Sequence, residues 1–131
     1  MNGIPQELAW VERRAACNLA EVFHQLCMEI ADDIIAINGL RPKELCFKQE
    51  SLSDGSIVIG QPMRTPRVTV MIGIVDREIM VRNQLKREEW SATVGLNDAG
   101  RCVLRLRNGS ELETWQFRKK ALEELFFGDK P

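Results

Sequence analysis

The order of hydrophobic and polar residues divides the chain into a long helical segment followed by a series of strands. Apolar residues recur every three or four positions from Leu8 to Ile37, and this spacing predicts one amphipathic helix over Pro5 to Ile37. Asn38 and Gly39 favour a helix stop there. Beyond that stop, apolar and polar residues alternate along most of the chain, as in strands. The pattern predicts a single α+β domain over residues 1–131, in which the long N-terminal helix packs on an antiparallel meander sheet of six to seven strands and a short C-terminal helix follows.

The predicted long helix carries a second apolar stripe on a flank that its main stripe does not include. Five residues fall together on that flank at 100° per residue, and we call them the second stripe: Trp10, Cys17, His24, Met28 and Ile35. A helix with two apolar sides usually has two neighbours. Either the C-terminal helix or a loop of the same chain covers the second stripe, or two copies of the chain pair their long helices there. We expect the second arrangement, a homodimer with these five residues in its interface.

Turn residues locate the strands. The clearest pair of strands flanks a tight turn at Asp76-Arg77, which places Ile79 opposite Ile74. By the same register, Val81 lies opposite Ile72. Earlier in the chain, the dipeptide Asp54-Gly55 suits a two-residue hairpin loop.

The last hairpin allows its register to be predicted from charge and burial. A two-residue Asn108-Gly109 loop would place Leu106 opposite Glu111, with a carboxylate on the apolar face. A three-residue loop over 108–110 instead places Leu106 opposite Leu112 and Arg107 opposite Glu111. Opposite charges across strands contribute roughly 0.2–1 kcal/mol each, whereas an unpaired buried carboxylate costs several. We therefore predict the loop over 108–110.

The C-terminal helix is predicted over Phe117 to Phe127, with Gly128 as its stop. Its charges run against the helix dipole, because the basic residues at positions 118–120 occupy its positive end. Either the last strand runs through Arg118 and the helix begins later, or these basic residues have another partner.

Composition limits the classes of partner. The chain has 18 Lys and Arg against 19 Asp and Glu, a net charge of −1, which argues against nucleic acid or an anionic membrane surface as a partner. No apolar run approaches the ~20 residues of a membrane span. The four cysteines are far apart and form no Cys-x-x-Cys pair, and Cys17 and Cys27 cannot bridge within one helix. We expect a cytoplasmic protein in a reducing compartment.

Candidate catalytic and metal chemistry is sparse. His24, the single histidine, follows Glu21 at the Glu-x-x-His spacing of carboxylate-bridged di-iron bundles. Those sites draw carboxylates from several helices, and this chain offers one long helix. No Ser or Cys lies in a strand-to-helix elbow. We therefore assign no metal ligand, no cofactor and no catalytic residue, and whether the chain has an enzymatic activity stays open.

A small-molecule pocket is the other possibility. An antiparallel sheet curving around a long helix leaves space at its open end, and such pockets are mostly apolar with a few polar groups. We expect Met71, Met80 and Trp90 to line that space and Arg82 to bind an acidic ligand head. The competing interpretation is that the Met and Trp side chains are ordinary core residues.

The order of elements resembles cystatin-like and helix-grip architectures in outline, with no shared motif, and a fold alone does not give a function. The function predicted from the sequence is a non-catalytic protein-interaction or assembly module, homodimeric through the second stripe. The alternative is a protein that binds a small apolar ligand between helix and sheet, and a further alternative is an enzyme of unknown chemistry.

Overall fold

The computed structural model describes residues 6–65 and 67–128. In chain order the elements are α1 (Gln6–Ala16), α2 (Leu19–Asn38), the short 3₁₀ turn η1 (Lys43–Leu45), β1 (Lys48–Ser51), β2 (Ile57–Gly60), β3 (Thr69–Val75), β4 (Glu78–Asn83), β5 (Glu88–Leu96), β6 (Cys102–Leu106), β7 (Glu111–Leu112) and α3 (Thr114–Phe127). The α+β class, the antiparallel meander and the short C-terminal helix predicted from the sequence are confirmed. Pro5 and Pro66 lie outside the described residues.

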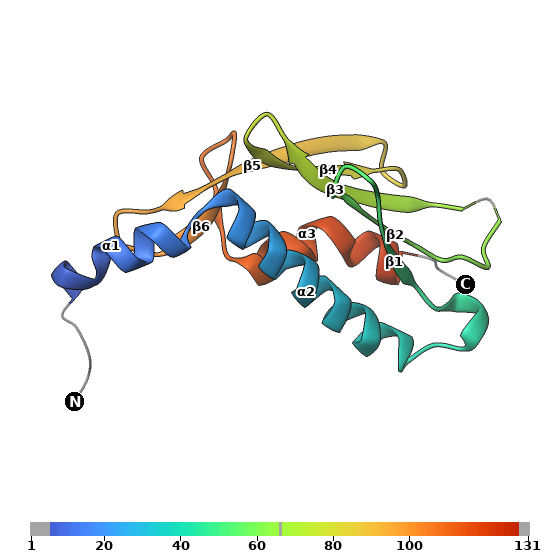
Figure 1. Ribbon diagram of the computed structural model, residues 1–131. Helices are drawn as coiled ribbons and strands as arrows, with labels where there is room; N and C mark the ends of the chain where they lie inside the picture. The colour runs from blue at the N-terminus through green and yellow to red at the C-terminus, as the bar shows by residue number, and fades with distance from the viewer. Residues whose placement is uncertain (1–5, 66, 129–131) are drawn as a thin grey trace.

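The strands form one seven-stranded antiparallel sheet within the described ranges, in the order β1-β2-β3-β4-β5-β6-β7. Helices α2 and α3 lie side by side against one face of this sheet (Figure 1). The molecule therefore has two layers. One face of the sheet is covered by helices, and we call the opposite face the open face.

The hydrophobic core lies between the two layers. Side chains of α2 spaced three or four residues apart meet alternate side chains of the strands, because helical and strand periodicities each direct one face inward. The fully buried members include Leu26 and Ile30 of α2, Ile72 of β3, Val81 of β4 and Phe117 of α3. Burial of these apolar side chains removes their surface from water. This contributes roughly 25 cal/mol per Å² and is the main stabilising contribution between the two layers.

The turn between β3 and β4 has the predicted form. Asp76 and Arg77 both have positive φ, as a two-residue type I′ turn requires, and Ile74 pairs with Ile79. Ile72 pairs with Val81 as well. This part of the prediction is confirmed residue by residue.

Three other hairpins share one loop design, which was not predicted from the sequence. Each has a three-residue loop whose last residue is a glycine with positive φ, namely Gly55, Gly100 or Gly109. In each loop that glycine donates its N–H to the carbonyl oxygen of the residue just before the loop. A left-handed residue at the third position closes such loops, and glycine adopts it without a steric penalty.

This loop design corrects two predicted registers. The β1–β2 loop spans 53–55 rather than the dipeptide Asp54-Gly55. The β6–β7 loop spans 107–109 rather than 108–110, so Arg105 pairs with Glu111 and Leu104 with Leu112. The pairing of charge with charge and apolar with apolar is as predicted, but the register is shifted by two residues because Gly109 must be the last loop residue.

The predicted single helix over Pro5 to Ile37 is also wrong, because the structure divides it into α1 and α2. The break is at Cys17 and Asn18. Asn18 has extended backbone, its side-chain Oδ1 accepts the N–H of Glu21, and its Nδ2 donates to the carbonyl oxygen of Ala15. One side chain thus satisfies a donor at the start of α2 and an acceptor at the end of α1.

Helix α3 begins at Thr114, three residues before the predicted start. Glu113 and Gln116 form a capping box, in which each side chain accepts the backbone N–H of the other residue. The basic residues near its start have partners elsewhere. Arg118 binds two carboxylates of α2, and the ammonium of Lys120 lies 5.1 Å from the ring centroid of Trp90. The unfavourable position at the helix dipole is therefore offset by contacts with other elements.

Candidate functional site

The side of α2 that points away from the sheet carries large exposed apolar residues. Met28 is 59% exposed and Ile35 is 71% exposed, although the opposite side of the same helix is buried in the core. His24 and Ala31, which share this side at helical spacing, are exposed too. We call His24, Met28, Ala31 and Ile35 the outer face of α2. Three residues of the predicted second stripe therefore share one accessible surface.

The other two residues of the second stripe lie elsewhere. Trp10 is 60% exposed, but it belongs to α1, beyond the bend at residues 17 and 18 (Figure 1). Cys17 is only 2% exposed and forms a disulfide with Cys102 of β6. The periodicity that placed all five residues together assumed a continuous helix, and the bend separates them.

An apolar groove runs between α2 and α3. It has a volume of about 370 Å³, and its apolar lining includes Ile37, Leu40, Trp115, Leu122 and Phe127. This groove was not predicted from the sequence, since only contacts between helices that are distant in the chain reveal it. The signal available in the sequence was the pair of large aromatic residues, Trp115 and Phe127, outside the inward side of the C-terminal helix.

Charged residues cross-link the two walls of this groove. Arg118 of α3 donates from Nη1 to Glu29 at 2.8 Å and from Nε to Asp33 at 2.9 Å. Burial raises the pKa of Asp33, the positive charge of Arg118 lowers it, and the nearby carboxylates of Glu29 and Asp32 raise it. The net effect is a raised pKa of Asp33. Its carboxylate is partly desolvated and is held by one arginine.

The residues predicted to line a ligand pocket do not share one cavity between helix and sheet. Met71, Met80 and Arg82 alternate with fully buried core residues, so they lie on the open face. Met71 and Arg82 line a hollow of about 740 Å³, whereas Met80 and Trp90 line a different hollow of about 490 Å³. The ring of Trp90 itself packs against Phe117 in the core, with centroids 5.0 Å apart.

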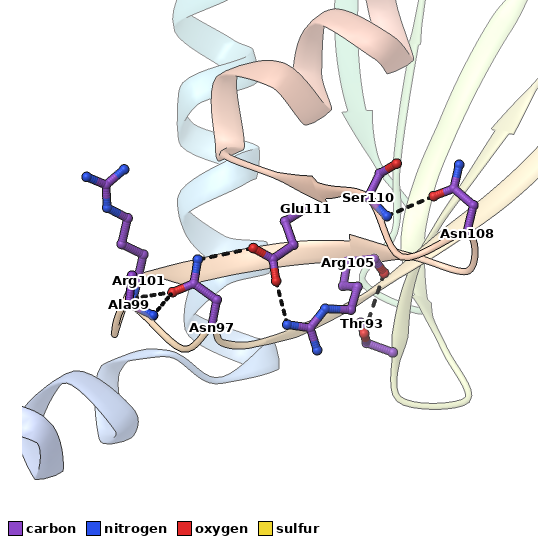
Figure 2. A network of polar contacts seen from close by, with 8 residues as sticks. All are labelled: Thr93, Asn97, Ala99, Arg101, Arg105, Asn108, Ser110 and Glu111. Carbon is purple, nitrogen blue, oxygen red and sulfur yellow. Dashed lines mark hydrogen bonds and ion pairs between the residues drawn. The ribbon is translucent and has the colours of Figure 1, made fainter.

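A polar network fixes the hairpins formed by β5, β6 and β7 (Figure 2). Asn97 accepts the N–H groups of Ala99 and Arg101 and donates from Nδ2 to Glu111. Arg105 donates to the other oxygen of Glu111 at 2.7 Å. These hydrogen bonds lower the pKa of Glu111, that from Arg105 most. The network holds in place the turn that leads into Cys102.

The groups with shifted pKa are distributed over separate segments, with Cys27 and Asp33 on α2, Asp54 in the β1–β2 loop and Glu111 on β7. Burial raises the pKa of the Cys27 thiol, which disfavours its reactive thiolate form. Hydrogen bonds from Ser56 lower the pKa of Asp54, in a hairpin loop far along the chain from Asp33 and Glu111. Among the described residues, no three His, Cys, Asp or Glu side chains gather where they could hold a metal ion. Of the helices described, none is long and apolar enough to cross a bilayer.

Comparison of the chain with models of known protein families, with curated proteins and with solved structures finds no match.

Proposed function

We propose that this protein is a non-catalytic protein-interaction module that assembles as a homodimer through the outer face of α2. The observation that carries the proposal is the exposure of Met28 and Ile35 on a helix whose opposite side is buried in the core. Large exposed apolar residues at helical spacing form the kind of surface that a second helix covers.

The spacing along the outer face supports helix pairing. His24, Met28, Ala31 and Ile35 are separated by four, three and four residues, which is the alternation found at the seams of paired helices. A small residue at position 31 lets the two backbones approach closely. In a two-fold dimer each copy contributes the same four residues, so one short patch supplies both sides of the seam.

The charge at the start of α2 favours an antiparallel pair. Glu21 lies seven residues before Met28 on the same side of the helix, so in a parallel pair it would face Glu21 of the other copy, and like charges repel. An antiparallel pair that places Met28 opposite Ala31 of the second copy instead brings Glu21 near the uncharged Asn38. It also sets the two helix dipoles in opposite directions, which is favourable.

The dimer interface has to extend beyond the outer face of α2, because these four side chains bury too little surface for a stable dimer. Stable interfaces bury about 800 Å² per partner, more than four side chains provide. The α2–α3 groove adjoins the seam through Ala36 and adds the exposed Leu40 and Phe127. We propose that these residues form the rim of the dimer interface.

Native mass spectrometry tests this assembly. We expect the purified protein to be a dimer and the variant Met28→Glu/Ile35→Glu to be a folded monomer, since neither side chain belongs to the core. The matched control is Leu45→Glu/Leu52→Glu, which adds the same charge at two other exposed apolar positions. A monomeric wild-type protein in the micromolar range, or a double variant that stays dimeric, would refute the proposal.

A second candidate function, binding of a small apolar ligand, is supported by the α2–α3 groove. Its volume of about 370 Å³ and its apolar lining suit such a ligand. The same spectra test it, because a bound ligand adds mass that Ala36→Phe, which fills the groove, should remove. Absence of any added mass after incubation with a fatty acid would argue against this candidate.

The cytoplasmic location expected from the sequence stays a proposal. The Cys17–Cys102 disulfide bears on it, because disulfides persist in oxidising compartments and are rare in the cytosol. A cytoplasmic protein of this sequence would hold the two cysteines mainly as thiols. Trapping the thiols by alkylation in intact cells would show which form is present.

A further inference from the structure

Helix α1 is held in place by few contacts. Every described side chain of α1, from Trp10 to Ala16, is exposed, and the helix lies chiefly along β5. Cys17, the residue that follows α1, is buried and covalently joined to Cys102 on β6. The covalent bond is therefore the main anchor of the bend between α1 and α2.

The two ends of this anchor differ in rigidity. Cys102 follows the turn that Asn97 and Glu111 fix by hydrogen bonds (Figure 2). Cys17 joins α1, a helix of eleven residues whose side chains from position 10 onward are exposed, to α2. Helices of that length are marginally stable on their own in water, so α1 has little to hold its position once the bond is cut.

The sequence around the bend favours a continuous helix. Val11, Ala15, Leu19 and Val22 keep helical spacing through it. In a continuous helix the backbone groups of residues 14–21 would bond to one another, whereas the side chain of Asn18 now satisfies one donor and one acceptor there. The bend is thus an arrangement that the disulfide imposes on a segment with helical periodicity.

We infer that the Cys17–Cys102 disulfide is a thiol–disulfide exchange site, and that its reduction by a dithiol lets α1 and α2 join into one straight helix. The incoming thiolate attacks the sulfur of Cys102, the exposed partner, and Cys17 leaves as a thiolate that takes up a proton. The second thiol of the reagent then displaces Cys102. Both cysteines end as thiols, having gained two electrons and two protons, and the dithiol becomes a disulfide.

Straightening completes the second stripe. Trp10 and Met28 are eighteen residues apart, which is five full turns at 3.6 residues per turn, so a continuous helix places them on the same side. Reduction thus adds Trp10 to the apolar outer face of α2. A longer apolar stripe strengthens pairing of two copies, and this last step alone rests on the proposed homodimer.

Nuclear magnetic resonance of the backbone tests the straightening. The protein used is Cys27→Ser/Cys46→Ser, which keeps the disulfide and removes the two free thiols. On addition of dithiothreitol, we expect the Cα shift of Asn18 to change from an extended to a helical value, with residues 10–16 still helical. Cys17→Ser/Cys102→Ser should show the helical values without reductant.

Two results would overturn the inference: shifts of Asn18 that stay extended after reduction, or loss of helical shifts in α1. If the Cys17→Ser/Cys102→Ser variant does not fold, the Cα shifts of the reduced Cys27→Ser/Cys46→Ser protein test the straightening by themselves. Sedimentation of the two redox forms tests the assembly step separately. A straight helix without tighter dimerisation would refute the homodimer link and leave the exchange site standing.

Discussion

Arg118 of α3 and Asp33 of α2 lie 85 residues apart in the chain and are joined by a hydrogen bond of 2.9 Å from Nε to Oδ2. The same guanidinium also binds Glu29 on the preceding turn of α2, so one side chain links two turns of a neighbouring helix. The Arg118 side chain is only 17% exposed, and partly desolvated charges interact more strongly than those in water. This contact sets how α2 and α3 lie beside each other, and with it the shape of the groove.

Loss of this contact should destabilise the fold. We expect Arg118→Ala to lower the free energy of unfolding by about 2 kcal/mol, because two half-buried carboxylates lose their partner. Arg105→Ala is the matched control: Arg105 also pairs with a carboxylate but is 47% exposed, so its loss should cost below about 1 kcal/mol. Urea titration measures both changes. Equal losses in the two variants would contradict the structural role given to Arg118.

Glu111 should make the stability depend on pH. Its folded pKa is lowered, mainly by the hydrogen bond from Arg105, so its contribution is present above the unfolded pKa and is lost as pH falls through the folded value. We expect Glu111→Gln to be less stable than wild type at neutral pH and the difference to close in acid. In an Arg105→Met background the difference should shrink. Denaturant titrations across the acidic range measure it, and a difference that does not vary with pH would contradict the prediction.

Asp33 should make the stability depend on pH in the direction opposite to that of Glu111. Its folded pKa is raised, chiefly by burial, so the folded state binds the proton more tightly than the unfolded state. Its contribution is full below the unfolded pKa and is lost as pH rises through the folded value. Titration of Asp33 followed by carboxyl NMR shifts should therefore give a midpoint above that of an Asp in an unfolded peptide of the same local sequence. A midpoint below that reference would show that Arg118 outweighs burial.

The hairpin glycines should be costly to replace. Gly109 has a φ of 90°, and no atom lies within 4 Å of the place that an added Cβ would occupy, so Gly109→Ala tests backbone strain alone. We expect a loss of about 1–2 kcal/mol, the range of the left-handed penalty for a residue with a Cβ. Gly95→Ala is the control, because Gly95 also has open space but no positive φ. That variant should be neutral or slightly stabilised, and equal effects at both positions would refute the loop design.

The sequence predicted most accurately what depends on neighbouring residues. The Asp76-Arg77 turn fixes the β3–β4 register, since a two-residue loop leaves one pairing that keeps the apolar residues on one face. The β6–β7 register was wrong because charge pairing alone does not distinguish shifts of two residues. The left-handed loop position of Gly109 does distinguish them.

The hydrophobic pattern of the neighbouring residues could not predict the bend between α1 and α2. It depends on Cys102, 85 residues away, and an Asn at position 18 fits the polar side of a long helix as well as it fits a cap. The α2–α3 groove was missed for a related reason. It arises from contact between two helices at opposite ends of the chain, and helical periodicity within each one does not say which neighbour it has.

Asn18 gives a prediction whose sign depends on the disulfide. In the oxidised protein the bend is fixed, so Asn18→Ala removes a cap and should cost about 1 kcal/mol. In a Cys17→Ser/Cys102→Ser background with a continuous helix, position 18 is a helix interior, where Ala is favoured over Asn by several tenths of a kcal/mol. Thermal and urea unfolding of the four variants measures both effects. The substitution should therefore destabilise the bridged protein and stabilise the unbridged one, and the same sign in both would mean that the bend persists without the disulfide.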